Sequence, residues 1–196
     1  MPPRRKKPRP YLDTNVILDY VRHRNNDSVV LLDALLHRRI RSYTSYYTIL
    51  ELIDKQQEEK WTRRRLDERE TLDNIIRHRF PRELTTDELK AVHNDLAKKF
   101  FKPFVESAIM TVLTPTAKTW DAILELLQKW NFSVGDAFHV DAALGSKCNI
   151  LISNDSPMLR ILNESKLIAC ASPSELEKKL AELGMWSIVS SRRLTH

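Results

Sequence analysis

Apolar residues in this chain follow two spacings, and the two kinds of segment alternate along the sequence. Short apolar runs predict strands, and longer stretches with apolar residues at helical spacing predict helices between them. The predicted strands are 9–12, 40–44, 108–113, 149–153 and 167–171. The predicted helices are 15–23, 31–37, one from 44–45 onward, 85–101, 116–129, 133–144, one from 156 onward, and 172–184.

This alternation predicts an α/β fold. Strands separated by helices are expected to form right-handed crossovers and a parallel sheet covered on both faces. In such folds the carboxyl ends of the strands form the ligand crevice. The three glycines all lie beyond residue 130, so the first part of the chain has no glycine-rich phosphate loop and a P-loop or dinucleotide-binding fold is excluded.

One segment differs in composition from the rest. Residues 55–79 are highly charged and contain neither glycine nor proline, which suits a long exposed helix or a helix pair. The length of 196 residues favours a single domain. We expect a basic, proline-rich arm at 1–8, a domain at 9–184 with a charged helical insertion at about 55–103, and a tail at 185–196.

The charge and cysteine content narrow the environment and the partners. The net charge of +6 and the pI near 9.4 favour a polyanionic partner. The two cysteines, Cys148 and Cys170, form no disulfide framework and fit a reducing cytoplasm. No apolar stretch approaches the roughly 20 residues needed to cross a bilayer, and the basic start lacks the apolar part of a secretory signal.

Four acidic residues stand where a strand ends or a helix begins: Asp13, Glu51, Asp136 and Asp155. Each has a plain structural interpretation, because acidic side chains cap helices and favour first turns. Glu51 is different, because its neighbours are apolar and a buried carboxylate needs a partner. If the sheet brings the four together they repel one another, and a divalent cation with oxygen ligands, Mg²⁺ or Mn²⁺, resolves that repulsion.

Other polar residues in the same segments are supporting candidates. Asn15 is expected to aim its amide at the site, and Ser153 to orient a water or a phosphate oxygen. Asp141 lies five residues after Asp136, about 140° round the helix, and is expected outside the set. His139 lies one turn from Asp136, where it either faces the crevice or is a structural core residue.

Four motifs in order resemble the PIN-domain nucleases. They are Tyr-Leu-Asp-Thr-Asn-Val-Ile-Leu at 11–18, Thr-Ser-Tyr-Tyr-Thr-Ile-Leu-Glu-Leu at 44–52, Gly-Asp-Ala-Phe-His-Val-Asp-Ala-Ala-Leu at 135–144, and Ile-Leu-Ile-Ser-Asn-Asp at 150–155. The resemblance implies a three-layer α/β/α sandwich with a central, mostly parallel five-stranded sheet. It also implies a metal-dependent endoribonuclease whose catalytic and metal-binding residues are Asp13, Glu51, Asp136 and Asp155.

Within that family the chain resembles VapC-like toxins of toxin–antitoxin modules, which implies a homodimer and a cognate antitoxin protein. Two departures stand out. The charged region at 55–103 makes this chain longer than the compact toxins, and Asp141 replaces a residue that is usually small.

Basic residues are expected to bind RNA. The internal candidates are Lys60, Trp61, Arg63, Arg64 and Arg65, with Trp61 placed to stack a base. The alternative is a solvated helix face, because acidic residues at 58–59 and 67–70 offer countercharges. Basic runs at 4–9 and 192–193 are expected to contact phosphates.

Two other functions stay open. The first is a catalytically silent module of the same fold that binds RNA or protein. The second is a DNA nuclease of related fold.

Overall fold

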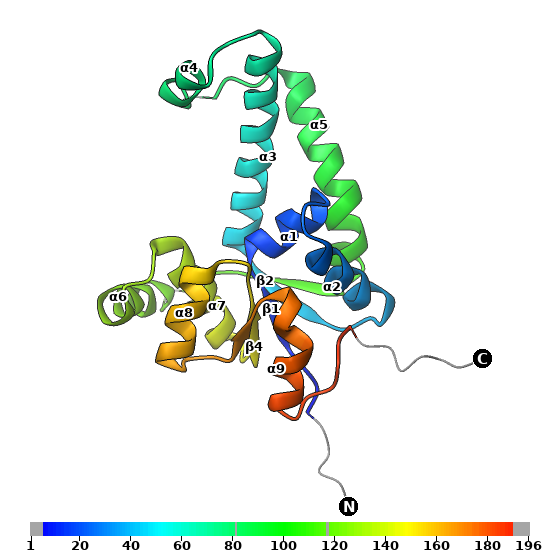
Figure 1. The fold of residues 1–196 in the computed structure, drawn as a ribbon, viewed down its shortest axis with the longest axis vertical. Coiled ribbons are helices and arrows are strands. Elements are labelled where there is room, and N and C mark those ends of the chain that lie inside the picture. Colours follow the sequence, from blue (N-terminus) through cyan, green and yellow to red (C-terminus); the bar gives the residue numbers. More distant parts are fainter. Residues whose placement is uncertain (1–5, 81, 117, 190–196) are drawn as a thin grey trace, which may run out of the picture.

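Five parallel strands form the centre of the molecule. The structure is a computed structural model that describes residues 6–80, 82–116 and 118–189. The strands are β1 (Pro10–Leu12), β2 (Ser42–Ser45), β3 (Met110–Leu113), β4 (Ile150–Ile152) and β5 (Cys170–Ala171). Their order is β3-β2-β1-β4-β5 (Figure 1). The five predicted strands are confirmed at shorter lengths, and the sheet is parallel throughout rather than mostly parallel.

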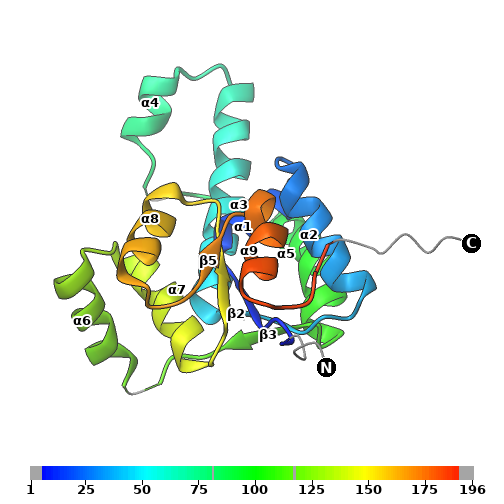
Figure 2. The same ribbon diagram turned by 60° about the horizontal axis from the view of Figure 1, so that its bottom comes forward.

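Helices cover both faces of the sheet. One face carries α1 (Thr14–Val21), α2 (Asn26–His37), α9 (Leu176–Glu182) and the inner ends of α3 (Tyr46–Asp67) and α5 (Thr86–Leu96). The other face carries α6 (Thr119–Trp130), α7 (Val134–Gly145) and α8 (Ser156–Ser165) (Figure 2). Each face has its own apolar core, and successive residues of a strand point into opposite cores. Leu12 packs in the core on the side of α1, and Tyr11 packs in the core on the side of α7. The predicted three-layer α/β/α sandwich is therefore confirmed.

Several predicted helix ends carry the expected caps. Thr85 and Glu88 form the capping box that opens α5, and Ser133 caps α7 through the Asp136 amide. The helix expected to end near Phe101 instead runs on as a π-helix, η1 (Ala97–Glu106), which includes Pro103. The fully buried Phe100 and Phe104 anchor this segment in the core, which explains why the proline does not end it. A short 3₁₀-helix, η2 (Pro173–Glu175), precedes α9.

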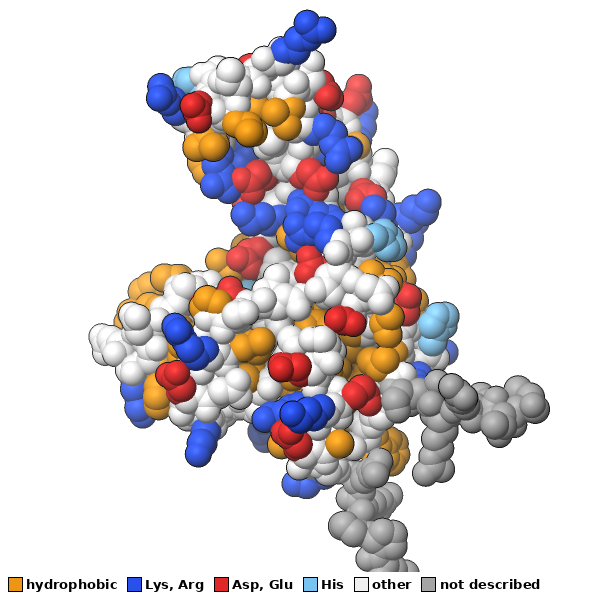
Figure 3. All heavy atoms as spheres, in the orientation of Figure 1, with side chains coloured by type: hydrophobic (Ala, Val, Ile, Leu, Met, Phe, Trp, Pro, Cys, Tyr) orange, Lys and Arg blue, Asp and Glu red, His pale blue; other side chains and the backbone are white. Residues whose placement is uncertain are grey.

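The charged region forms an arm that rises from the sheet (Figure 1). It consists of the outer part of α3, the short helix α4 (Leu72–Arg77) and the outer part of α5. For residues 55–79 the sequence left open a long helix or a helix pair, and the structure has two helices there, α3 and α4. Basic and acidic side chains are interspersed along it (Figure 3). Ion pairs such as Arg64–Glu88 and Arg65–Glu70 link its parts.

Residues 6–8 and 185–189 pack with the domain, although the predicted boundaries place them in the arm and in the tail. Lys6, placed in the predicted arm, forms an isolated parallel bridge with Met185, placed in the predicted tail. Ile188 is fully buried, and the amides of Ile188 and Val189 donate to the Glu177 carboxylate. The domain therefore includes 6–8 and 185–189. Of the basic runs expected at 4–9 and 192–193, residues 4–5 and 192–193 lie outside the described residues.

Seven described residues other than glycine have positive φ, and each lies at the C-terminal end of a helix. Positive φ at this position is typical of glycine, which has no Cβ to clash with the backbone. They are His23, Arg39, Arg69, Ala108, Asn131, Lys147 and Lys166. Within the described residues, none of the helices combines the length and the apolarity needed to span a membrane.

Candidate acidic active site

The four predicted acids line one pocket at the carboxyl edge of the sheet. Asp13 follows β1, Glu51 lies in the second turn of α3, Asp136 lies in the first turn of α7, and Asp155 follows β4 as the N-cap of α8. The pocket has a volume of about 330 Å³. The parallel order of the strands brings residues more than 100 positions apart to the same place.

Asp13 is the most enclosed of the four, with 4% of its surface exposed. Its Oδ1 accepts from the amide of Thr14 at 2.6 Å, so it is also the cap of α1. Its Oδ2 accepts from the hydroxyl of Ser153 at 2.6 Å. Burial raises the pKa of Asp13, against the opposing effects of His139 and the Ser153 hydrogen bond. The plain interpretation of Asp13 as a helix cap is thus confirmed, and its role as a metal ligand stays a prediction.

His139 links Asp13 to Glu51. Its Nε2 lies 3.0 Å from Asp13 Oδ1 and 3.1 Å from Glu51 Oε2, and its Nδ1 lies 2.9 Å from the hydroxyl of Tyr11. The ring is 3% exposed. Burial by itself lowers a histidine pKa, but the hydrogen bond to Glu51 and the charge of Asp13 outweigh it and raise the pKa of His139. Asp13 and Glu51 therefore favour the protonated, positively charged form of His139.

Glu51 is only half-buried, and its carboxylate is well satisfied. The hydroxyl of Thr14 donates to its Oε2, and His139 shares the same oxygen. Burial opposes its ionisation, but hydrogen bonds from His139 and Thr14 hold its pKa below the usual value. The prediction that Glu51 needs a partner is confirmed, and its partners include Thr14 and His139.

Asp136 and Asp155 form the other side of the pocket. Burial raises the pKa of Asp136, and the charge of Asp155 raises it further. Asp155 accepts from the amide of Met158 at 2.9 Å as the cap of α8. This pair therefore carries negative charge that is less compensated than that of Asp13 and Glu51.

Asn15 and Ser153 join the loops after β1 and β4. Asn15 Nδ2 donates to Ser153 Oγ at 3.1 Å, and Asn15 Oδ1 accepts from the Asn154 amide at 2.9 Å. Ser153 is fully buried and also accepts from the Asp155 amide. The two side chains hold Asp13 and Asp155 in a fixed relation.

The donor set suits a hard divalent cation by its chemistry. Carboxylate oxygens predominate, and burial raises the pKa values of Asp13 and Asp136 because it disfavours their ionised forms. The geometry is not that of a formed cage, since no group of three or more His, Cys, Asp or Glu side chains among the described residues is arranged to hold an ion. The His139 ring lies between Asp13 and Glu51.

Further pocket residues were not among the predicted site residues. Thr14, Tyr47 and Lys55 line it as well. Thr14 and Tyr47 belong to the motifs at 11–18 and 44–52, and Lys55 follows Glu51 by one helical turn. The sequence positions of these three residues could therefore have identified them as candidates. Asp141 lies outside, in a neighbouring cavity, as predicted.

The predicted RNA-binding residues on α3 have partners within the protein. Trp61 is 4% exposed, and the Arg65 guanidinium lies over its ring. The prediction that Trp61 offers an exposed ring for stacking a base is therefore wrong. Arg63, Arg64 and Arg65 pair with Glu59, Glu88 and Glu70. Lys60 lines a groove between α1, α3 and α5. Except for Trp61, their RNA binding stays a prediction.

Comparison with known proteins gives a likeness in structure alone. Neither the known protein families nor the curated proteins contain a match to this sequence. Among solved structures, the chain is similar to one in the crystal structure of FitAcB from Neisseria gonorrhoeae, with a TM-score of 0.55 and 16% identity. The match covers 84% of this chain and 98% of that chain. The protein thus has a PIN-like α/β/α fold that it shares, at the level of architecture, with FitAcB.

Proposed function

We propose that the protein is a metal-dependent endoribonuclease that hydrolyses RNA phosphodiester bonds. The observation that carries the proposal is the convergence of Asp13, Glu51, Asp136 and Asp155, from four separate elements, on one pocket. If the four acids only capped helices, they would have no reason to meet in one pocket. The net charge of +6 favours a polyanionic substrate.

The four carboxylates would hold Mg²⁺ or Mn²⁺. Such an ion, when bound, offsets the charge of a phosphate and lowers the pKa of a bound water. Ser153 orients Asp13 through its hydroxyl, and Thr14 orients Glu51 in the same way. Lys55 lines the pocket and offers an ammonium group to the substrate, although it also pairs with Glu58 at 3.1 Å.

The toxin role rests on the sequence resemblance to VapC-like proteins. The PIN-like fold supports it, because this resemblance implies such a fold. We propose a cognate antitoxin protein as the inhibitor, a homodimer as the assembly and the cytoplasm as the compartment. Expression in a bacterial host tests the toxin role. Growth arrest is expected from the wild type, and relief is expected from Asp13→Ala. Arrest that persists with Asp13→Ala would contradict the role.

RNA cleavage tests the nuclease itself. Purified protein is incubated with structured RNA in Mn²⁺, in Mg²⁺ and in EDTA. Cleavage is expected only with metal and is expected to be lost in Asp13→Ala and Asp136→Asn. Asp121→Asn, at an exposed position of α6, is the matched control and should cleave normally. Equal cleavage by Asp13→Ala and the wild type would remove the proposed site.

A second candidate is a silent RNA-binding module. It is favoured by the His139 ring, whose Nε2 lies within hydrogen-bonding distance of both Asp13 and Glu51 and so offers these carboxylates a partner within the protein. The same samples separate the two functions. RNA that binds but remains uncut in both metals supports the silent module.

A further inference from the structure

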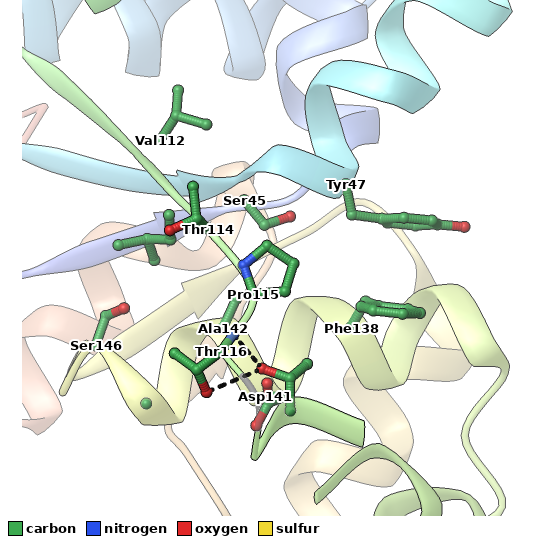
Figure 4. Close-up of a pocket in the computed structure, with 13 residues that line it drawn as sticks. Ser45, Tyr47, Val112, Thr114, Pro115, Thr116, Phe138, Asp141, Ala142 and Ser146 are labelled. Atoms are coloured by element: carbon green, nitrogen blue, oxygen red, sulfur yellow. Dashed lines mark hydrogen bonds between the residues drawn. The ribbon is translucent and has the colours of Figure 1, made fainter. Parts of the chain in front are cut away.

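A second cavity lies at the same edge of the sheet and has no part in the proposed chemistry. Its volume is about 300 Å³, near the lower end of small-ligand pockets. It is bounded by the ends of β2 and β3, the loop after β3 and one side of α7 (Figure 4). The residues that line these walls include Ser45, Pro115, Phe138, Asp141 and Gly145.

The acidic pocket and this cavity adjoin each other. Tyr47 lines both, and its ring stacks on Phe138 with centroids 5.0 Å apart and planes 13° apart. Helix α7 also serves both, because Asp136 and His139 line the acidic pocket while Phe138 and Asp141 line the cavity. A polymer bound at the acidic pocket therefore has a neighbouring cavity in reach.

Asp141 places a carboxylate in this cavity. The side chain is half-buried, and its own hydrogen-bond partner is the Thr119 hydroxyl. A carboxylate has about four acceptor positions, so capacity remains for a ligand that donates. Burial raises the pKa of Asp141, which shows that its charge is poorly solvated there. The other walls combine apolar and aromatic side chains with the hydroxyls of Thr114 and Thr116.

We propose that this cavity is a base-binding subsite for RNA beside the scissile phosphate, with Asp141 as the residue that selects guanine. The subsite rests on the proposed function for the nature of its ligand. A flat heterocycle matches the apolar and aromatic walls, as in other nucleic-acid sites that hold an unstacked base.

Guanine is the base whose donors fit a carboxylate best. Its Watson–Crick edge presents two adjacent donors, N1–H and the N2 amine, to the two oxygens of one carboxylate. Adenine and cytosine present one exocyclic amine beside an acceptor, which a carboxylate repels. Discrimination by a good bidentate pair is typically worth a factor of about 10 or more.

Binding in EDTA tests the subsite without requiring cleavage. Short uridine oligonucleotides carry one central guanine, inosine or adenine, and affinity is measured by fluorescence anisotropy at fixed salt. The guanine oligonucleotide is expected to bind wild type about 10-fold more tightly than the other two. Inosine lacks only the N2 amine, so it isolates that contact.

Variants assign the preference to the cavity. Asp141→Asn is expected to bind all three oligonucleotides within about twofold of each other, and Asp121→Asn is expected to keep the preference. Gly145 lines the cavity, so Gly145→Leu is expected to narrow it while keeping Asp141. A Cβ at this position meets no atom within 4 Å, so the first atom of the new side chain causes no clash. Gly145→Leu is expected to weaken guanine binding, and a melting curve checks that each variant is folded.

Two results would overturn the subsite: equal wild-type affinity for the three oligonucleotides, or a preference that survives in both Asp141→Asn and Gly145→Leu. Failure of the nuclease is a separate result. Guanine-selective binding without cleavage in Mn²⁺ contradicts the nuclease and keeps the subsite. Metal-dependent cleavage together with equal affinity for the three oligonucleotides keeps the nuclease and removes the subsite.

Discussion

The Nε2 atom of His139 lies 3.0 Å from Oδ1 of Asp13, in the interior of the acidic pocket. Glu51 lies at a similar distance from the same nitrogen. A single imidazole therefore bridges two carboxylates that would otherwise repel each other. The two carboxylates favour the protonated form of the ring, and this form offsets part of the cost of burying Asp13.

Replacing His139 is expected to destabilise the metal-free protein. In His139→Ala, Asp13 and Glu51 lose their shared partner, and leaving a buried charge without its partner costs about 3 kcal/mol. Urea unfolding in EDTA measures the loss, with the exposed His93→Ala as control. Losses of equal size in the two variants would contradict the bridge.

The same replacement has a defined pH dependence. The pKa of His139 is raised in the folded protein, so its contribution to stability is fully present below the ordinary value of 6.5 and declines as pH rises through the folded value. The stability difference between wild type and His139→Ala should therefore shrink at alkaline pH. A constant difference would contradict a charged ring. If the proposed metal binds, Mn²⁺ should stabilise the variant more than the wild type.

Neutralising Asp136 is expected to stabilise the fold and abolish cleavage. Burial and the neighbouring Asp155 raise the pKa of Asp136, so its ionised form lowers stability at neutral pH. Asp136→Asn should gain about 0.5–2 kcal/mol, the range typical of single stabilising replacements. The gain should decline as pH falls through the raised pKa of Asp136 in the folded protein, and it should be absent below the ordinary value of 3.8. Thermal melting across this range measures it, and a loss of stability at neutral pH would contradict it.

The thiols are expected to react slowly in the folded protein. Cys148 and Cys170 are 8% and 3% exposed, and burial raises the pKa of Cys148 to about 11. At about pH 8 the reactive thiolate is then a small fraction. A chromogenic disulfide reagent should modify the native protein far more slowly than the urea-unfolded protein. Equal rates in the two states would show that the cysteines are accessible.

Trp61 is expected to act through packing rather than through RNA. Removal of a buried tryptophan costs about 3–5 kcal/mol, so Trp61→Ala should unfold at lower urea concentration. Trp61→Phe keeps an apolar ring and should retain most of that stability. The RNA affinity of the folded Trp61→Phe protein should equal that of the wild type. A weakened affinity at unchanged stability would restore the stacking role.

The acidic site was predictable because it depends on topology. Carboxylates that follow β1 and β4 must meet at one edge of a parallel sheet, and this holds whatever the exact strand lengths are. Asn15 and Ser153 could be assigned for the same reason, since each lies two residues from one of those acids.

His139 and Trp61 depend on packing that the local pattern does not reveal. The position of His139 one turn after Asp136 indicated only its side of the helix. Its role comes from Tyr11, Asp13 and Glu51, which belong to other elements. Trp61 lies in a charged sequence that favours solvent, and its burial comes from the folding back of the arm. Local composition contains no information about either contact.

The helix ends with positive φ have a practical consequence. A residue with a Cβ pays about 1 kcal/mol for this conformation, which glycine adopts freely. None of the seven lines the acidic pocket. Glycine at such positions, for instance in place of Lys147 or Lys166, offers a route to a more heat-resistant protein that leaves every side chain of the acidic pocket as it is.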